Sequence, residues 1–208
     1  VLIMKKKDLA MLLSKFKLFD KPSSSLEQYY TDPELAADAL WFIHMHDGFN
    51  GKLVADLGCG NGVLGLGALA LGAGKVFFVD SDKDVISLAR HNLKVLEKIF
   101  KKKFKAKFIN KDVGFFSDKV DMVVQNPPFG VQKPHADRLF LFKAMGVSPL
   151  IYSFHKLESD SFISKFSSDN RFIARRCLVF DFLIRMTMPF HRKRFYKFKV
   201  GFWRISLA

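Results

Sequence analysis

Residues 53–62 read LVADLGCGNG, a short apolar run that ends in an aspartate and a glycine-rich turn. The apolar run predicts a buried strand, and the glycines let the backbone of the turn approach a ligand closely. Apolar residues continue to about Leu71, so we expect a helix after the turn. A strand, a glycine turn and a helix in this order are typical of sites for nucleotide-like ligands in α/β proteins.

Outward from this turn, expected strands alternate with expected helices along most of the chain. The strands cover residues 53–57, 75–79, 105–110, 120–125 and 150–154, and the other helices cover residues 5–19, 31–46, 83–100, 137–145 and 158–167. Two longer apolar runs, 177–188 and 195–206, predict an antiparallel pair around a short basic loop. The pattern predicts a doubly wound, mostly parallel, seven-stranded Rossmann-like α/β sheet with an antiparallel C-terminal strand. We expect residues 1–208 to form a single domain, with residues 1–47 as an N-terminal helical extension within it.

The composition favours a polyanionic partner. Lysine and arginine number 34 against 20 acidic residues, which gives a net charge of +14, and such a balance suits phosphate neutralisation. The alternative is a strongly solvated surface of the kind found in heat-loving organisms. Two cysteines and no Cys/His cluster with zinc spacing indicate a reduced, cytoplasmic-type protein without a metal site. No apolar stretch is long enough to span a bilayer.

Polar side chains follow four of the expected strands where each strand ends: Asp56, Asp80, Asp112 and Asn126. Ligands of open α/β sheets bind beyond these carboxyl ends, so we expect a single site there. A carboxylate at Asp56 would repel a pyrophosphate but attract the ammonium group of S-adenosylmethionine. Asp80 is placed for ribose hydroxyls and Asp112 for an adenine amino group, although an ordinary loop acid remains the alternative for Asp112. Asp82 is interpreted as a helix cap.

The tetrapeptide Asn126-Pro127-Pro128-Phe129 suits chemistry on an exocyclic amine. The Asn126 side chain offers a carbonyl acceptor, and the two prolines stiffen the loop because their φ angles are fixed. Phe129 offers a flat face for a planar ring. Two acceptors aimed at an –NH2 group would hold it in plane and favour the positive charge that builds on its nitrogen. The alternative is an Asn-Pro turn that only ends a strand.

These residues resemble a class I S-adenosylmethionine-dependent methyltransferase of the N6-adenine or amino type. Further segments make the chain similar to the methyltransferase-like 5 family over residues 26–208: Leu26–Tyr29, Thr31, Ala55–Gly60, Leu71–Gly74, Asn126–Gly130 and Ser153–Lys156. Two features depart from the family. Tyr30 stands where a proline is usual, and the stretch after Phe129 is shorter.

The resemblance implies an enzyme that makes N6-methyladenosine in small-subunit ribosomal RNA with S-adenosylmethionine as cofactor. It implies that the cofactor is bound by Gln28, Tyr29, Thr31, Asp56, Gly58, Cys59, Gly60, Asp80, Asp112 and Asn126. Thr31 could also cap the following helix. The RNA-contacting residues would be His155, Lys156, Arg192, Lys193 and Arg194, although His155 and Lys156 could simply close a loop after the fifth strand.

The resemblance also raises the possibility of a small zinc-binding activator protein, with which eukaryotic relatives work. Phenylalanine-rich stretches at 75–79 and 104–109 are expected at an open sheet edge, which could pair with such a partner unless helices of this chain cover it.

Three alternative functions remain at this stage. The first is a methyltransferase that acts on DNA adenine or on a protein glutamine, although Phe129 and the basic charge favour nucleic acid. The second is a non-catalytic RNA-binding ribosome-assembly factor, which the set of Asp56, Asp80 and Asn126 argues against. The third is a nicotinamide oxidoreductase, which Asp56 disfavours.

Overall fold

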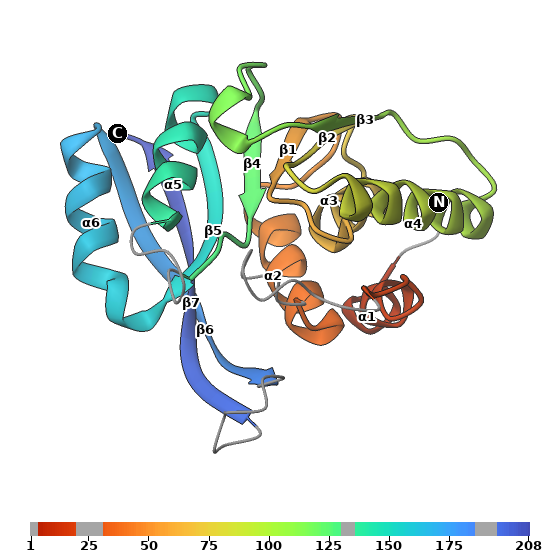
Figure 1. The fold of residues 1–208 in the computed structure, drawn as a ribbon, viewed down its shortest axis with the longest axis horizontal. Helices are drawn as coiled ribbons and strands as arrows, with labels where there is room; N and C mark the ends of the chain where they lie inside the picture. Colours follow the sequence, from red (N-terminus) through yellow and green to blue (C-terminus); the bar gives the residue numbers. More distant parts are fainter. Residues whose placement is uncertain (1–3, 20–30, 130–135, 186–194) are drawn as a thin grey trace.

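A single seven-stranded sheet forms the centre of the protein (Figure 1). The structure is a computed structural model that describes residues 4–19, 31–129, 136–185 and 195–208. Its strands are β1 (Leu53–Leu57), β2 (Lys75–Asp80), β3 (Ala106–Asn110), β4 (Met122–Gln125), β5 (Leu150–Lys156), β6 (Phe172–Arg185) and β7 (Phe195–Leu207). Its helices are α1 (Lys6–Leu13), α2 (Pro33–His46), α3 (Val63–Ala70), α4 (Lys83–Phe100), α5 (Ala136–Val147) and α6 (Asp160–Asp169), with short 3-10 turns η2 (Val113–Phe115) and η3 (Leu157–Ser159).

The strand order is β3-β2-β1-β4-β5-β7-β6. Strands β1 to β5 pair in parallel, whereas β7 runs antiparallel to both β5 and β6. This arrangement confirms the predicted mostly parallel sheet with an antiparallel C-terminal strand. The chain builds outward from β1 to β3 on one side and then starts again at β4 on the other side. The carboxyl ends of β1 and β4 therefore flank the topological switch point, where open α/β sheets bind their ligands.

Helices cover both faces of the sheet, and each face has its own core. Val54 on β1 packs in the core that includes residues of α1, α2, α3 and α4, whereas its neighbour Ala55 packs with α5 and α6 on the other face. In Figure 1 these two groups of helices lie on opposite sides of the strands. Strands buried on both faces must be apolar at nearly every position, which explains the continuous apolar runs in the sequence.

Several predicted boundaries and one predicted cap differ from the structure. Helix α2 is capped by Asp32, whose Oδ1 accepts hydrogen bonds from Glu34 N at 2.9 Å and Leu35 N at 3.3 Å. The suggestion that Thr31 caps this helix was therefore wrong. The predicted cap of α4 is confirmed, because Asp82 accepts from the backbone N–H of Asp84 at 2.8 Å.

Helix α1 ends at Leu13 and not at Phe19, and β5 continues to Lys156. Strand β6 begins at Phe172 and not at Cys177, because its pairing with β7 runs back to Leu207. Boundaries depend on these long-range backbone pairings, which local apolar patterns do not encode.

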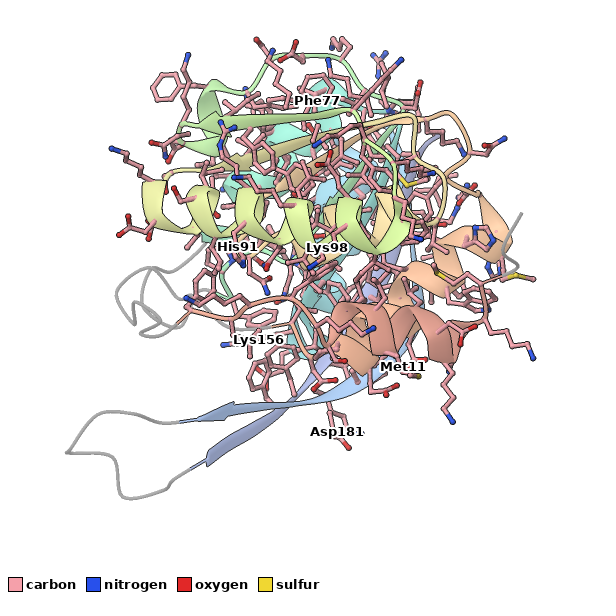
Figure 2. The ribbon with its side chains drawn as sticks, turned by 90° about the vertical axis from the view of Figure 1, so that its right-hand side faces the viewer. Met11, Phe77, His91, Lys98, Lys156 and Asp181 are labelled. Atoms are coloured by element: carbon pink, nitrogen blue, oxygen red, sulfur yellow. The ribbon has the colours of Figure 1, made fainter. Side chains whose placement is uncertain are left out.

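The β6–β7 hairpin extends past the end of the sheet. Pairing of β5 with β7 ends at Lys156 and Val200, but β6 and β7 remain paired beyond that point, from Asp181 and Lys199 to Arg185 and Phe195. Figure 1 shows this hairpin projecting beyond the carboxyl ends of the parallel strands, and in Figure 2 it stands clear of the body with Asp181 pointing outward. No described helix is long and apolar enough to cross a membrane.

Candidate active site

Asp56 joins β1 to the start of α3. Its carboxyl is only 1% exposed, and Oδ2 accepts a hydrogen bond from Gly65 N at 2.8 Å. Gly62, the cap residue of α3, has no side chain, so Asp56 serves the helix N-terminus from the neighbouring strand. A Cβ at Gly65 would lie 3.0 Å from Asp56 Oδ2 and 2.5 Å from the Phe78 ring, so only glycine fits. Burial raises the pKa of Asp56 well above its ordinary value, although the Gly65 N–H opposes this shift.

Asp80 fixes the glycine turn to the end of β2. Its Oδ2 accepts from Gly60 N and its Oδ1 from Asp82 N, both at 3.0 Å. On the other side of the turn, the N–H groups of Gly58 and Cys59 donate to the Val79 carbonyl at 2.9 and 3.0 Å. Burial raises the pKa of Asp80 as well. The turn is thus held in shape by the Asp80 carboxyl and by backbone contacts, with the buried Asp56 and the partly buried Asp80 beside it.

Asn92 on α4 holds the N-terminal segment against the glycine turn. Its Oδ1 accepts from Lys17 N at 2.8 Å, and its Nδ2 donates to Lys17 O and to Asn61 O, both at 3.0 Å. Asn92 is fully buried. Sequence reasoning missed this residue, but a signal was present. With Val85, Ala89 and Leu96, which are also buried, Asn92 continues the apolar stripe of α4 as a lone amide.

The Asn126 amide is oriented by Thr31. Its Nδ2 donates to Thr31 Oγ1 at 2.9 Å, which brings together two residues that are 95 positions apart in the chain. Its Oδ1 is buried and has no hydrogen-bond partner in the part of the chain that is described. Buried polar atoms are nearly always paired, so an unpaired one at the predicted ligand-binding edge marks a position for a donor from outside the protein.

Phe129 connects the Asn-Pro-Pro-Phe segment to the projecting hairpin. Its ring is 7% exposed and makes edge contacts with Phe182 on β6 and Phe198 on β7, with centroid separations of 5.4 and 5.3 Å. Lys156 lies with its Nζ 5.8 Å from the Phe198 centroid. These three rings and the Lys156 ammonium group therefore meet where the hairpin leaves the sheet.

The remaining predicted residues divide into three groups. Asp112 is exposed and caps η2 by accepting from Gly114 N at 2.8 Å. His155 lies within β5 and not after it, and with 1% exposure its ring faces the interior. The predicted residues that lie outside the described part of the chain are Gln28, Tyr29, Arg192, Lys193 and Arg194.

The strand order, the glycine turn after β1 and the acidic and amide side chains at the carboxyl ends define a class I methyltransferase. Comparisons with known proteins agree. The Methyltransferase small domain family matches residues 36–145. The rRNA N(6)-adenosine-methyltransferase METTL5 of Danio rerio is 32% identical, with 98% of this chain and 99% of that protein covered. The chain belongs to the methyltransferase small domain family and, within it, to the methyltransferase-like 5 family.

Two further comparisons support this assignment. An uncharacterized protein of Methanocaldococcus jannaschii is 36% identical over 98% of this chain and 95% of that protein. A crystal structure from Pyrococcus horikoshii, provisionally described as an RNA methyltransferase, is 42% identical and superposes with a TM-score of 0.86 over the whole of both chains. Magnesium protoporphyrin IX methyltransferase of Synechocystis, at 15% identity and a TM-score of 0.63, shares the fold.

Proposed function

We propose that the protein transfers a methyl group from S-adenosylmethionine to N6 of an adenosine in ribosomal RNA, and that this RNA belongs to the small subunit. The observation that carries the proposal is the buried Asn126 Oδ1, which lacks a partner among the described residues. Relatives from Danio rerio, Drosophila melanogaster and Caenorhabditis elegans are rRNA N(6)-adenosine-methyltransferases, with identities of 32%, 30% and 27%.

The chemistry of the pocket residues fits the cofactor. Neither Asp56 nor Asp80 forms an ion pair with a lysine or arginine within the described ranges, and burial raises the pKa of both. A buried carboxyl of this kind gains when a cation comes close. The ammonium group of S-adenosylmethionine would supply that cation at Asp56, and ribose hydroxyls would lie at Asp80. Gln28, Tyr29, Thr31, Gly58, Cys59, Gly60 and Asp112 would complete the cofactor site.

In the proposed mechanism the protein positions an amine and stabilises developing charge. When bound, the cofactor supplies a methyl group on a positively charged sulfur. Asn126 Oδ1 and the Pro127 carbonyl accept the two hydrogens of the adenine amino group, each bond contributing about 1 kcal/mol in ordinary contexts. With the cofactor bound, the adenine N6 would take up the methyl group as the carbon–sulfur bond breaks and would then lose a proton to water. The two acceptors favour the charge that builds on N6, so their effect is greatest in the transition state.

RNA would reach this site from the side of the projecting hairpin. The hairpin stands beside the carboxyl ends of the strands, and its connecting segment contains Arg192, Lys193 and Arg194. Phe129 would stack on the extruded base; its ring is 7% exposed and packs against Phe182 and Phe198, so stacking would require these rings to move apart. Extrusion from a duplex costs a few kcal/mol, so an unpaired or weakly paired adenosine is the favoured target.

A small activator protein would bind at the outer strand β3. That strand ends the sheet, so one row of its backbone groups lacks a neighbouring strand. On one face it is covered by α4, where Arg90 lies 4.5 Å from the centroid of the Phe108 ring. Helix α1 packs on α2 and α3 instead. A monomer that stays in solution alone would show that the activator is unnecessary, whereas aggregation relieved by a co-expressed partner would support it.

One experiment separates the proposed reaction from its alternatives. Purified protein is incubated with labelled S-adenosylmethionine and, separately, with RNA, DNA and protein fractions. We expect labelled N6-methyladenosine after nucleoside analysis of the small-subunit RNA. Label in a protein glutamine or in DNA would redirect the assignment, and no transfer to any acceptor would reject it.

The Asn126→Ala variant tests the mechanism. It removes the acceptor that engages the amine but leaves the Asp56 and Asp80 contacts in place. We expect cofactor affinity to stay within about twofold by titration calorimetry, while methyl transfer falls by on the order of a hundredfold or more. Equal turnover at saturating RNA would contradict the assigned role.

A further inference from the structure

A chain of four polar side chains runs from β4 over β5 to α5, beside the active site. Gln125 Nε2 donates to Ser153 Oγ at 3.0 Å, and Ser153 Oγ lies 2.7 Å from His155 Nε2. On the far side of the imidazole, His155 Nδ1 lies 3.4 Å from Asp137 Oδ2. Gln125, Ser153 and His155 are each at most 1% exposed. The proposed mechanism uses none of these four side chains.

The Asp137 carboxylate can only accept a hydrogen bond, and this favours one set of proton positions in this chain. The Ser153 oxygen accepts from Gln125, so its own hydroxyl hydrogen is free to donate to His155 Nε2. A neutral imidazole that accepts at Nε2 must carry its hydrogen on Nδ1. That N–H faces the carboxylate of Asp137. Burial raises the pKa of Asp137, but His155 together with the backbone N–H groups of Arg138 and Asp137 outweighs burial and the pKa is lowered, which indicates an ionised acceptor.

Serine, histidine and aspartate in this order also form the triad of hydrolytic enzymes, but the geometry here does not suit a nucleophile. Ser153 is completely buried, so no substrate carbonyl can reach its oxygen. That oxygen also accepts a hydrogen bond from Gln125. A nucleophilic serine needs access and an activated, unoccupied oxygen. The chain of side chains is therefore better explained as a positioning device.

One end of this chain of side chains lies directly before the catalytic segment, and the other lies on the next helix. Gln125 is the last residue of β4 and directly precedes Asn126, whereas Asp137 lies in the first turn of α5. Ser153 and His155 on β5 bridge them, and Ser153 pairs laterally with Gln125. Movement of the end of β4 or of α5 relative to β5 would thus stretch the same set of contacts.

We propose that Gln125, Ser153, His155 and Asp137 form a relay that ties the end of β4 to β5 and α5 and so places Asn126 Oδ1 for methyl transfer. These are positioning residues and do not touch the reacting atoms. The inference rests on the proposed amine methyltransferase function. The Asp137 contact at 3.4 Å is longer than an ordinary hydrogen bond, and His155 Nδ1 has no hydrogen-bond partner among the described residues, so this link acts through charge.

The groups around His155 determine the pH at which its imidazole gains a proton, and so the pH at which the relay changes. Asp137 on α5 and Ser153 on β5 face the imidazole, and Trp203 on β7 contacts it edge-on at 5.7 Å between centroids. The indole N–H of Trp203 donates to Asp160 at 3.4 Å. Burial lowers the pKa of His155, against the effect of Asp137. Protonation of Nε2 would turn it from acceptor to donor, so at acid pH the hydrogen bond with Ser153 Oγ would reverse and the Ser153 hydroxyl hydrogen would have to turn away.

The test compares Asp137→Ala, Asp137→Asn and Ser153→Ala with a control, Asp169→Ala, which removes an exposed acid from α6. We expect kcat to fall by on the order of tenfold to a hundredfold in Asp137→Ala and Ser153→Ala, because small misplacements of reacting groups have effects of that size. Cofactor Kd should change by about twofold or less. Asp137→Asn should recover part of kcat, because its carbonyl dipole can still face Nδ1. The double variant should lose no more than the worse single variant.

The pH profile separates positioning from general loss of structure. Removal of the Asp137 carboxylate lowers the pKa of His155 further, so the acid limb of kcat should move to lower pH in Asp137→Ala and stay in place in Asp169→Ala. Wild-type kcat in both relay variants would overturn the inference. So would a loss of kcat that parallels lost cofactor binding and a lower Tm with an unmoved acid limb. A wild-type protein that methylates no amine would instead refute the proposed function.

Discussion

At the scale of single residues, the active site depends on which way one amide points. An asparagine that accepts hydrogen bonds from a substrate amine must keep its own NH2 group turned away. Thr31 provides this orientation, because its hydroxyl oxygen receives Asn126 Nδ2 at 2.9 Å. Since Asp32 caps α2, the Thr31 hydroxyl is not engaged as the helix cap. We therefore expect Thr31 to increase the rate of methyl transfer as well as to contribute to cofactor binding.

The Thr31→Val variant removes the hydroxyl but keeps the side-chain shape. Loss of one neutral hydrogen bond corresponds to about 1 kcal/mol, so we expect kcat to fall roughly fivefold or more. Thr31→Ser should retain turnover close to that of the wild type. Single-turnover methyl transfer at saturating RNA and cofactor measures the effect. A higher cofactor KM with unchanged kcat would show that Thr31 serves only the cofactor.

The sequence allowed the chemical roles of individual residues to be predicted better than the residues with which they form hydrogen bonds. Asp56, Asp80 and Asn126 could be singled out because polar residues stand out at the ends of apolar strands, and the structure places them at the carboxyl ends of β1, β2 and β4. The contact between Thr31 and Asn126 could not be predicted, since it joins residues 95 positions apart through tertiary structure. Burial of His155 was also missed, because the apolar pattern of β5 ends one residue before it.

At the scale of secondary-structure elements, the glycine turn needs support from outside its own strand and helix. Asn92 on α4 provides it by bonding the backbone of Lys17 and of Asn61. The segment that follows Lys17 leads toward Gln28 and Tyr29, which are predicted to cover the cofactor. One buried amide thus connects the N-terminal extension, helix α4 and the cofactor turn.

Replacement of Asn92 by alanine should weaken both stability and cofactor binding. Three backbone groups would lose their buried partner, so we expect the free energy of unfolding to fall by about 1–3 kcal/mol. Cofactor Kd should rise because the N-terminal segment is released from the turn. Urea unfolding and calorimetric titration measure the two effects. Asn170→Ala, which removes an amide bonded to Phe166 O on α6, is the control and should leave cofactor Kd unchanged.

The projecting hairpin is the element whose role is best tested through salt. Its connecting segment contains Arg192, Lys193 and Arg194, and each phosphate contact adds about one unit to the slope of log affinity against log salt. Neutralising all three residues should weaken RNA binding and flatten that slope by up to about three units. Cofactor affinity should not change. An unaltered slope would mean that this segment faces something other than RNA.

At the scale of the whole molecule, the order of elements was predictable because parallel strands buried on both faces leave a clear apolar signature. The length by which the hairpin extends beyond the sheet could not be predicted, because its residues have the same apolar pattern as a buried strand. The contacts that join distant parts of the chain could not be predicted from the sequence either. Asp47, at the end of α2, binds Arg204 on β7 through two hydrogen bonds of 2.8 and 3.0 Å and also accepts from the Tyr152 hydroxyl.

This contact should make stability depend on pH in a definite direction. The guanidinium of Arg204 holds the pKa of Asp47 below its ordinary value, although burial opposes the shift. A carboxyl with a lowered folded-state pKa stabilises the protein above its unfolded-state pKa, and that stabilisation is lost as pH falls through the folded-state pKa. The contribution is therefore fully present at neutral pH and disappears in the acid range below about pH 4.

The Asp47→Asn variant should accordingly be less stable than the wild type by about 1–3 kcal/mol at pH 7, and this difference should become smaller as the pH falls to about 3. Urea unfolding at both pH values gives the comparison. Asp169→Asn breaks an exposed pair with Lys165 on α6 and should cost about 0.5 kcal/mol or less at either pH. An equal loss for Asp47→Asn at both pH values would mean that shape, and not charge, is what Asp47 contributes. In that case the N-terminal extension would be held to β7 by packing alone, and Arg204→Leu should then be tolerated at neutral pH.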